Sequence, residues 1–327
     1  MRAWQVRATG EPEAVLHLVD TDIPEPGPGF VRIDVAAAAI GLPDVLMCRG
    51  TYPLTPDGRF TPGQEVCGTV AALGAGVDPS LFGRRVMAVT AFYLGLGGFA
   101  EHALAAADTC FDVPDSMTDD DAAGFTIPFH TGWIGLHRRA RLQPGETLLV
   151  LGAAGGSGAA AVTLGQAMGA QVLAVAGGPD KLAFCAGLGA DVLIDHRDAD
   201  IAEAARQATD GHGVDVVYDP VGGEAAAASM KALANEGRHL LVGFASGSWA
   251  SAPSHQVAVS NYSLVGVYAG AYDRARTERF HADILGHHDA GRLASIVTDR
   301  IRFDDLPTAL AGLSSRTAMG KRVLVLD

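Results

Sequence analysis

The chain changes its pattern of hydrophobic positions near residue 122. Before that point the apolar runs are short, and glycine and proline separate them, as in EPGPG (25–29) and GAGVDPS (74–80). Many short apolar runs with such turns are typical of an all-β domain. The runs VLHLVDTDIP, FVRIDVAAAAI, EVCGTVAAL, RRVMAV and FAEHALA therefore predict a β-barrel-like domain.

The rest of the chain alternates compact apolar runs with helical segments rich in small residues. The runs TLLVL (147–151) and QVLAVA (171–176) flank AAAVTLGQAMGA, and the alternation continues through DVLID, VDVVYDP, RHLLVGF and SLVGVYAG (263–270). Strands that alternate with helices of about 10 residues form βαβ units on a parallel sheet. Six such strands predict an α/β, doubly wound Rossmann sheet.

The turn GAAGGSG (152–158) stands between the first of these strands and its helix. Gly155 and Gly158 occupy the second and third glycine places of G-x-G-x-x-G, and Ala153 replaces the first. Bare backbone at such a turn lets a pyrophosphate approach the N–H groups that begin the helix. The alternative is a glycine-rich turn that only packs. We expect dinucleotide contacts from Ala154, Gly155, Gly156, Ser157 and Gly158.

The end of the second strand bears on the choice of dinucleotide. An NAD site usually places an acidic residue there for the ribose 2′-OH, but this strand ends in Ala176, Gly177 and Gly178. Asp180 is expected to cap the next helix. Lys181 could pair with a 2′-phosphate, or it could be a solvated lysine in the first helical turn. The pattern favours NADPH, with Gly177 and Lys181 among its contacts.

Composition narrows the partners and the compartment. The net charge of −13 argues against sequence-independent nucleic-acid binding and against anionic membranes. No apolar stretch approaches ~18 residues, and the N-terminus lacks the pattern of a signal peptide. The four cysteines are far apart and form no CxxC pair. A disulfide framework or structural zinc site is therefore not expected, and the expected compartment is the reducing cytoplasm.

Six stretches together resemble the medium-chain dehydrogenase/reductases, and within them the zinc-independent quinone oxidoreductase branch. They are LPDVLMCRGTYP (42–53), PGQEVCGTVAALGAGV (62–77), GETLLVLGAAGGSGAAAVTLGQAMGA (145–170), VDVVYDPVGG (214–223), SLVGVYAGAY (263–272) and RTAMGKRVLVL (316–326). The resemblance covers essentially the whole chain. It implies a GroES-like catalytic domain of residues 1–122 and 269–327, and a Rossmann dinucleotide-binding domain of residues 123–268. By analogy alone it also implies a homodimer that pairs through the sixth strand.

The resemblance bears on the use of a metal. Zinc-dependent members carry cysteine near Gly41, histidine at Gln64 and a four-cysteine lobe, whereas residues 90–115 contain only Cys110. The expected enzyme is therefore metal-free. Without a Lewis acid to stabilise an alkoxide, alcohol oxidation is disfavoured, and hydride transfer to a quinone or an activated enone remains. Glu65 then acts as a structural carboxylate rather than as a base.

The resemblance also carries over individual positions. Tyr52 resembles a tyrosine beside the nicotinamide, which either packs against the ring or donates a proton to an enolate. Thr131 matches a threonine that opens the helix facing the nicotinamide, and its neighbour His130 is either an acid or a satisfied helix-end histidine. The other implied cofactor contacts are His196, Gly243, Phe244, Ser246, Val267, Tyr268 and Arg316.

Two departures from the family, at Gly41 and Phe244, and the open role of Asp44 leave alternatives. The branch often has asparagine at Gly41, so one polar contact is missing there. Asp44 could orient a group in the cleft or cap the following helix. Enoyl reductases tend to carry lysine where Phe244 stands. The alternatives to a quinone reductase are an enoyl-thioester (acyl-CoA) reductase and an NADPH-binding sensor or structural protein without significant turnover.

Overall fold

The computed structural model describes residues 1–315 and 317–326. Its internal contacts divide the chain into two units, one of Met1–Ile127 with Val297–Asp327 and one of Pro128–Ile296. These boundaries differ from the expected ones after residues 122 and 268. The segment after 268 belongs with the second unit because His281 bonds to His130 and the N–H of Ala294 donates to Thr163. Arg316 lies outside the described residues.

The first unit contains a six-stranded sheet that closes on itself, as the short apolar runs predict. The order is β13-β14-β3-β4-β5-β6, and β3 also pairs with β6. Its strands are β3 (Phe30–Ile40), β4 (Glu65–Leu73), β5 (Arg85–Thr90), β6 (His102–Asp112), β13 (Val297–Arg302) and β14 (Lys321–Val325), beside a hairpin of β1 (Arg2–Val6) and β2 (Leu16–Asp20). Its helices are α1 (Pro12–Val15), α2 (Leu42–Cys48), α3 (Asp119–Ala123) and α11 (Leu306–Ser314).

The last residues of the chain complete this barrel. Strand β14 pairs antiparallel with β3, so that Arg322 lies opposite Ile40. The side chains of Val31, Ile33 and Leu324 are fully buried in one apolar cluster. The barrel therefore forms only when chain segments distant in sequence come together, which makes its core long-range.

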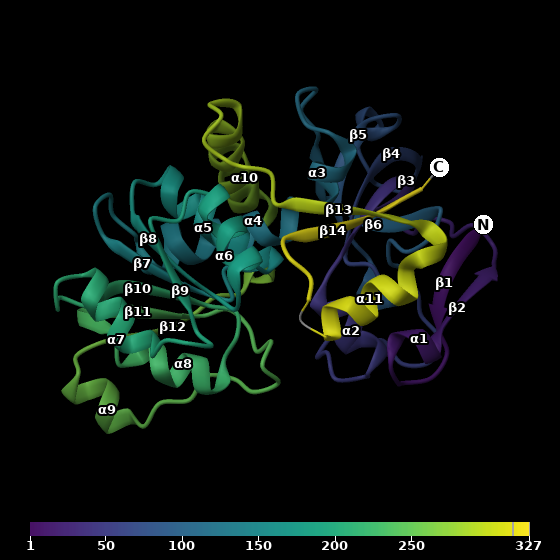
Figure 1. The fold of residues 1–327 in the computed structure, drawn as a ribbon. Coiled ribbons are helices and arrows are strands. Elements are labelled where there is room, and N and C mark those ends of the chain that lie inside the picture. Colours follow the sequence, from purple (N-terminus) through teal and green to yellow (C-terminus); the bar gives the residue numbers. More distant parts are fainter. Residues whose placement is uncertain (316, 327) are drawn as a thin grey trace. The chain divides into compact units, whose positions relative to one another are not determined.

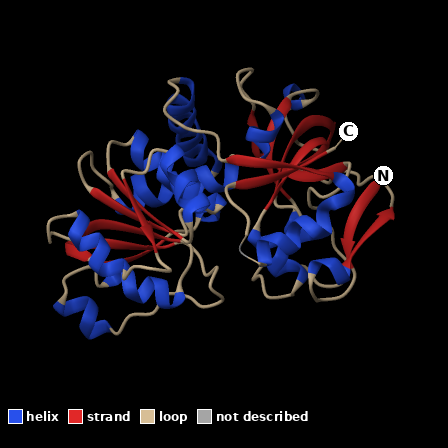
Figure 2. Cartoon of the chain, in the orientation of Figure 1, coloured by secondary structure: helices blue, strands red, loops and turns tan. Residues whose placement is uncertain are grey.

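The second unit is a six-stranded sheet in which every pairing is parallel, which confirms the predicted Rossmann architecture (Figures 1 and 2). The order is β12-β11-β10-β7-β8-β9. The strands are β7 (Thr147–Leu151), β8 (Gln171–Ala176), β9 (Val192–Asp195), β10 (Val214–Asp219), β11 (Leu233–Leu241) and β12 (Ser263–Gly266). The helices are α5 (Gly156–Ala167), α6 (Pro179–Gly187), α7 (Ile201–Ala208), α8 (Gly223–Met230), α9 (Ser254–Val259) and α10 (Arg274–Asp289).

Helices cover both faces of this sheet. Figure 1 shows α5 and α10 on one side of the strands and α7, α8 and α9 on the other. The strands β7 and β8 are buried almost throughout, because a parallel sheet covered on both faces needs continuous apolar runs. The order of the strands reverses between β7 and β10, which is the switch point where doubly wound sheets bind ligands.

The helix that enters the second unit is longer and less regular than expected. Helix α4 (Thr126–Trp133) continues into a π-helical segment, η3 (Ile134–Ala140). Thr131 therefore lies in the last turn of α4 and does not open a helix, which corrects the expectation from the family. The helix begins five residues earlier, at Thr126.

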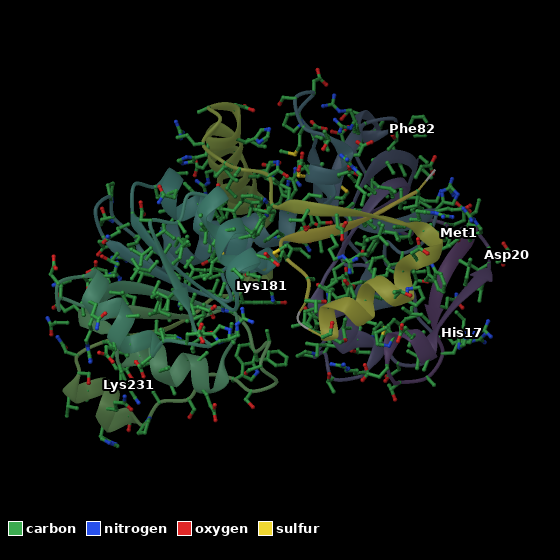
Figure 3. The ribbon with its side chains drawn as sticks, in the orientation of Figure 1. Met1, His17, Asp20, Phe82, Lys181 and Lys231 are labelled. Atoms are coloured by element: carbon green, nitrogen blue, oxygen red, sulfur yellow. The ribbon has the colours of Figure 1, made fainter. Side chains whose placement is uncertain are left out.

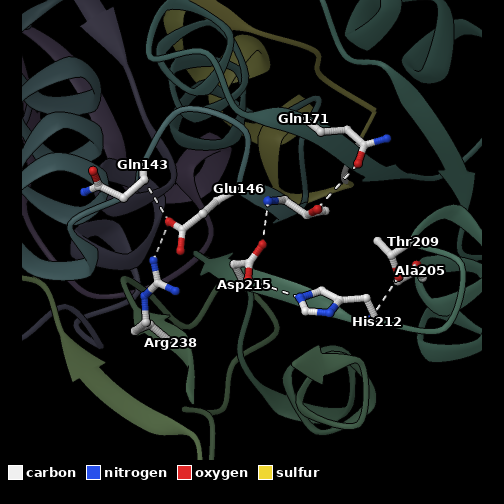
Figure 4. A network of polar contacts seen from close by, with 10 residues as sticks. Gln143, Glu146, Gln171, Ala205, Thr209, His212, Asp215 and Arg238 are labelled. Carbon is white, nitrogen blue, oxygen red and sulfur yellow. Dashed lines mark hydrogen bonds and ion pairs between the residues drawn. The ribbon is translucent and has the colours of Figure 1, made fainter. Parts of the chain in front are cut away.

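A polar network fixes the N-terminal ends of the central strands β7 and β10 (Figure 4). The Glu146 carboxylate accepts from the N–H of Gln143 at 2.8 Å and from Nη2 of Arg238 at 2.6 Å. The Asp215 carboxylate accepts from the N–H of Thr147 at 2.8 Å. Side chains thus hold the turn before β7 in one conformation.

Within the described residues, no helix combines the length and the apolar character needed to cross a membrane.

Candidate functional site

The turn between β7 and α5 has the geometry that a pyrophosphate site requires. Gly152 has a φ of 57°, so it makes the tight left-handed turn expected of the first glycine, one residue before Ala153. A Cβ on Gly158 would lie 2.8 Å from the Cα of Ala153 and would overlap the carbonyl of Gly152. The helix can therefore approach the strand this closely only with glycine at 158.

The start of α5 consists of small residues, and its N-cap is exposed. Gly155 is the N-cap residue and is exposed, while Gly156, Ser157 and Gly158 form the first turn, whose N–H groups have no partner within the helix. The Ser157 hydroxyl lies 2.9 Å from the buried Tyr218 hydroxyl. Burial raises the pKa of Tyr218 to about 12, so this phenol stays neutral and holds Ser157 in place.

The ends of β8 and β9 bring a second group of residues together. Register pairs Ala176 with Asp195, so the residues that follow both strands are neighbours. The Asp195 carboxylate accepts from the N–H of Gly178 at 2.9 Å and from the N–H of Arg197 at 3.0 Å. These hydrogen bonds hold the pKa of Asp195 below its ordinary value, so the group is an engaged carboxylate.

Arg197 is a cation at this corner that the sequence-based prediction missed. A Cβ on Gly178 would lie 3.1 Å from Nη1 of Arg197 and would overlap its Nη2 and Cζ. His196 lies on the same side, because a Cβ on Gly177 would be 2.8 Å from its Nε2. The missed signal was the sequence Asp-His-Arg at the end of the neighbouring parallel strand.

The structure places Lys181 in the first turn of α6, where it was predicted (Figure 3). The expectation for Asp180 was wrong. The N-cap residue of α6 is Gly178, and no side chain caps it. The Asp195 carboxylate binds the Gly178 N–H instead, because β9 delivers it to that point.

The cofactor contacts predicted near β11 and β12 lie in the loops that follow these strands. Phe244 packs on Trp249 with ring centroids 4.7 Å apart, and the Ser246 hydroxyl donates to the carbonyl of Ser248. Gly243 approaches Pro220, whose carbonyl would be 3.0 Å from an added Cβ. Val267 is buried whereas Tyr268 is exposed.

His130 is a structural residue. It is buried, and its Nε2 lies 3.0 Å from Nδ1 of His281. Burial, together with His281 and Arg274, lowers the pKa of His130 to about 3. The ring is therefore neutral at physiological pH and holds no imidazolium proton to give. Thr131 beside it is half-buried.

In the first unit, Asp44 joins two backbone segments. Its carboxylate is buried and accepts from the N–H of Gly41 at 2.9 Å and from that of Gly63 at 3.0 Å. The first bond closes the N-terminus of α2, so Asp44 caps this helix. Burial outweighs these bonds and nearby Lys321, and it raises the pKa of Asp44 to about 7.

Glu65 and Lys321 form a buried ion pair beside this cap. Glu65 is 2% exposed and also accepts from the N–H of Ile127 at 2.9 Å. Nζ of Lys321 lies 3.8 Å from the position that a Cβ on Gly41 would take. The carboxylate is thus structural, and Lys321 is a second charged residue that the sequence-based prediction missed.

The positions that hold zinc ligands in zinc-dependent relatives hold no such set here. Gly41 has no side chain, and Nε2 of the buried Gln64 lies 3.7 Å from Sδ of Met47. Within the residues that the structure describes, no group of three or more His, Cys, Asp or Glu side chains could hold a metal ion.

Tyr52 belongs to an aromatic cluster on the first unit. Its ring centroid lies 6.4 Å from that of Phe92, which packs edge-on against Tyr93 at 5.7 Å. Tyr93 and Leu94 are exposed, at 44% and 56%. The loops that carry these rings are joined by a bond from the N–H of Thr61 to the carbonyl of Gly95.

Two family profiles match the chain. The profile of the alcohol dehydrogenase GroES-like domain matches residues 27–115, and that of the zinc-binding dehydrogenases matches residues 156–284. A protein of Nematostella vectensis called quinone oxidoreductase-like protein 2 homolog is 32% identical over 99% of this chain and 88% of its own length. The chain belongs to the medium-chain dehydrogenase/reductase family, in its quinone oxidoreductase branch.

A solved structure and a polyketide synthase subunit are also similar to this chain. A mycobacterial protein solved with NADPH is 28% identical, with a TM-score of 0.92 over 100% of both chains. A phenolphthiocerol/phthiocerol polyketide synthase subunit of Mycobacterium tuberculosis is 32% identical over 90% of this chain, which spans 13% of that subunit.

We predict that Asp44 makes this medium-chain dehydrogenase/reductase less stable as the pH rises from 5 to 7. The folded state keeps the Asp44 proton up to about pH 7, whereas the unfolded chain releases it near pH ~3.9. The unfolded state therefore binds fewer protons in this window, and folding loses about 1.4 kcal/mol per pH unit until it levels off above pH 7.

Asp44→Asn lacks this titration. Urea unfolding at pH 5, 6, 7 and 8 should show the variant gaining about 2–3 kcal/mol relative to the wild type between pH 5 and 7. Asp22→Asn, at an exposed position, is the matched control and should track the wild type. A constant difference between Asp44→Asn and the wild type would show that Asp44 titrates normally.

Proposed function

We propose that this protein is an NADPH-dependent, metal-free oxidoreductase that transfers a hydride to a quinone or an activated enone. The observation that carries the proposal is the corner at the ends of β8 and β9. There Arg197 lies over Gly178 and pairs with Asp195 through Nε at 3.3 Å, while the Asp195 carboxylate also accepts from two backbone N–H groups. A cation beside bare backbone suits a 2′-phosphate, whereas an open carboxylate would repel it.

The chain's own residues would hold the dinucleotide in two places. The first turn of α5 offers N–H groups and the positive end of a helix to the pyrophosphate. Arg197, His196 and Lys181 offer charge and hydrogen bonds to the phosphorylated ribose. The bound cofactor supplies a hydride donor, and the protein supplies position and electrostatics. The mycobacterial relative solved with NADPH supports this assignment.

A resident zinc ion does not fit the first unit. Gly41 and Gln64 provide no thiolate or imidazole, and the Glu65 carboxylate is neutralised by Lys321. A catalytic zinc usually has three protein ligands. We therefore propose an acceptor that needs no Lewis acid, since a quinone or a carbonyl-conjugated double bond is already electrophilic.

The aromatic cluster suits a flat acceptor. Tyr52, Phe92 and Tyr93 pack as a group, and exposed Leu94 extends its apolar surface. Aromatic side chains of this kind pack well against planar rings. We propose that Tyr52 contacts the reacting groups through its ring and that its hydroxyl assists protonation of an enolate product. A hydroquinone product takes its proton from solvent.

We also propose a homodimer formed through β12, and a cytoplasmic location. Strand β12 is at the edge of its sheet, and Leu264 and Tyr268 near it are exposed. An unpaired edge with apolar side chains favours pairing with a second copy.

A second candidate is an enoyl-thioester reductase. The similarity to a polyketide synthase subunit favours it. Against it, Phe244 packs on Trp249 where enoyl reductases tend to carry a lysine, so a charge is missing from that loop. A third possibility, an NADPH-binding sensor, would bind the cofactor without turning over any acceptor.

The test of the proposed function is NADPH oxidation, followed by absorbance, with ortho- and para-quinones, alkenals and enoyl-CoA esters. We expect quinones to be reduced fastest, with NADPH preferred over NADH and no loss of rate with a chelator. A preference for enoyl-CoA esters would support the second candidate. Loss of activity on chelation would contradict the metal-free reading, and tight NADPH binding without turnover would indicate a sensor.

We predict that Arg197 contributes to selection of NADPH. Because a charge-assisted contact to phosphate is lost, Arg197→Ala should raise the KM for NADPH about 10-fold, an energy of about 1.4 kcal/mol, and leave that for NADH nearly unchanged. Arg206→Ala removes a charge elsewhere on the same unit and is the control. Equal effects on both cofactors would assign Arg197 a structural role.

A further inference from the structure

A pocket of about 540 Å³ lies on the second unit, away from the glycine turn. Gln143 and Pro144 line it just before β7, and Met168 lines it just before β8. The glycine turn follows the other end of β7. Five residues of extended strand separate the two ends by about 17 Å, so this pocket is a separate site.

The pocket is cationic in an acidic protein. Arg138 and Arg141 line it beside the imidazoles of His137 and His287, although the chain has 37 acidic residues against 24 lysines and arginines. Among the described residues, no carboxylate lies within ion-pair distance of Arg138 or Arg141, both of which are exposed. Unneutralised cations that converge on one hollow create a positive potential that attracts an anion.

Glu146 and Asp283, which interact with residues of the lining, do not pair with these arginines. The Glu146 carboxylate is engaged by Arg238 and by the N–H of Gln143. The charge of Asp283 raises the pKa of His287. Burial and the charge of Arg292 lower it by more, so the pKa of His287 lies below its ordinary value. The positive charge of the two exposed arginines therefore remains available to a ligand.

His287 adds a neutral donor. Nε of Arg292 donates to Nδ1 of His287 at 3.0 Å. Because a guanidinium can only donate, Nδ1 must accept, and the proton of the neutral ring is on Nε2. His287 therefore offers an N–H group beside the arginines.

The backbone that carries the arginines is unusual and firmly held. Arg138 belongs to the π-helical segment η3, and π-helical turns are frequent at functional sites. Arg141 ends it with a φ of 54°, a left-handed conformation that is uncommon outside glycine and persists where surrounding structure enforces it. The network around Glu146 in Figure 4 fixes the adjoining turn.

The pocket also has an apolar side. Trp133 is 4% exposed and stacks on His137, with ring centroids 4.6 Å apart and planes 15° apart. Leu142 and Met168 lie on the same lining. Within the described part of the chain, the buried indole N–H of Trp133 has no acceptor. A ligand for this pocket would therefore combine an acceptor or anion with an apolar body.

We propose that this pocket binds a small organic carboxylate with a flat apolar body, at a site separate from that of the cofactor. The carboxylate is held by Arg138 and Arg141, whose guanidinium groups match its geometry, with the Nε2–H of His287 beside them. The apolar body lies against Leu142 and Met168.

The test is calorimetric titration of the full chain with 1-naphthoate, with and without saturating NADPH. We expect saturable binding with a Kd of about 1 mM or lower in both conditions. The double variant Arg138→Ala/Arg141→Ala should weaken binding at least 10-fold. Lys231→Ala, which removes an exposed cation elsewhere on the same unit (Figure 3), should bind as the wild type does.

Three results would overturn the proposal: no saturation at any concentration up to about 10 mM, equal binding by the double variant, or equal weakening by Lys231→Ala. Competition by inorganic phosphate or by neutral 1-naphthamide as strong as that by the carboxylate would reject the ligand class. Melting curves check that the double variant is folded. If it is not folded, the same titration of the single variant Arg138→Ala decides between the outcomes. Because the titration without cofactor is independent of turnover, failure of the quinone assay does not affect it.

Discussion

The contact between Gly158 and Gly152 is the constraint on which the second unit depends. No side chain fits at Gly158, so the first turn of α5 lies directly against the end of β7. Because the helix begins so close to the strand, its free N–H groups lie at the switch point between β7 and β10. The hydrogen bond between the hydroxyls of Ser157 and buried Tyr218 then fixes the turn against the neighbouring strand β10. One steric requirement in the sequence thus fixes the turn at which we propose that the pyrophosphate binds.

The first unit depends on a charge rather than on a close contact. Glu65 is a buried carboxylate, and it is compensated by Lys321, which the last strand of the chain brings to it. Breaking such a pair leaves an unpaired buried charge, which costs about 3–5 kcal/mol. Lys321 is therefore the cation that faces the Glu65 carboxylate in the barrel. This pair is compatible with the proposed acceptor, which is already electrophilic and needs no bound cation.

Local sequence predicts the parts of the structure that depend on neighbours in the chain. The pattern of strand, glycine turn and helix identifies residues 147–167, and the alternation after it predicts the parallel sheet. The contacts that local sequence does not predict depend on how the strands pair. Arg197 and Asp195 lie beside Gly177 and Gly178, at the proposed 2′-phosphate site, only because β9 pairs with β8 in one register. Lys321 reaches Glu65 only because β14 adds to β3 beside β4, which carries Glu65.

Two other differences have a similar origin. The boundary expected after residue 268 is displaced to Ile296 because α10 packs within the second unit through His281. Thr131 does not open its helix because the residues before it are helical as well. In both cases, the extent of an element is decided by packing rather than by the local signals of glycine, proline or capping residues.

The most direct measurement is NADPH binding by Gly155→Val, compared with Gly187→Val. Gly155 has an ordinary φ of −83°, and an added Cβ would meet only the Gly152 carbonyl, at 3.4 Å. The fold should therefore survive, whereas the isopropyl group covers the backbone that the pyrophosphate must approach. An added Cβ on Gly187 meets nothing within 4 Å. We expect the Kd for NADPH to rise at least 100-fold, about 2.7 kcal/mol, in Gly155→Val alone, with its melting curve intact. Unchanged binding in a folded Gly155→Val protein would show that the cofactor is not held at this turn.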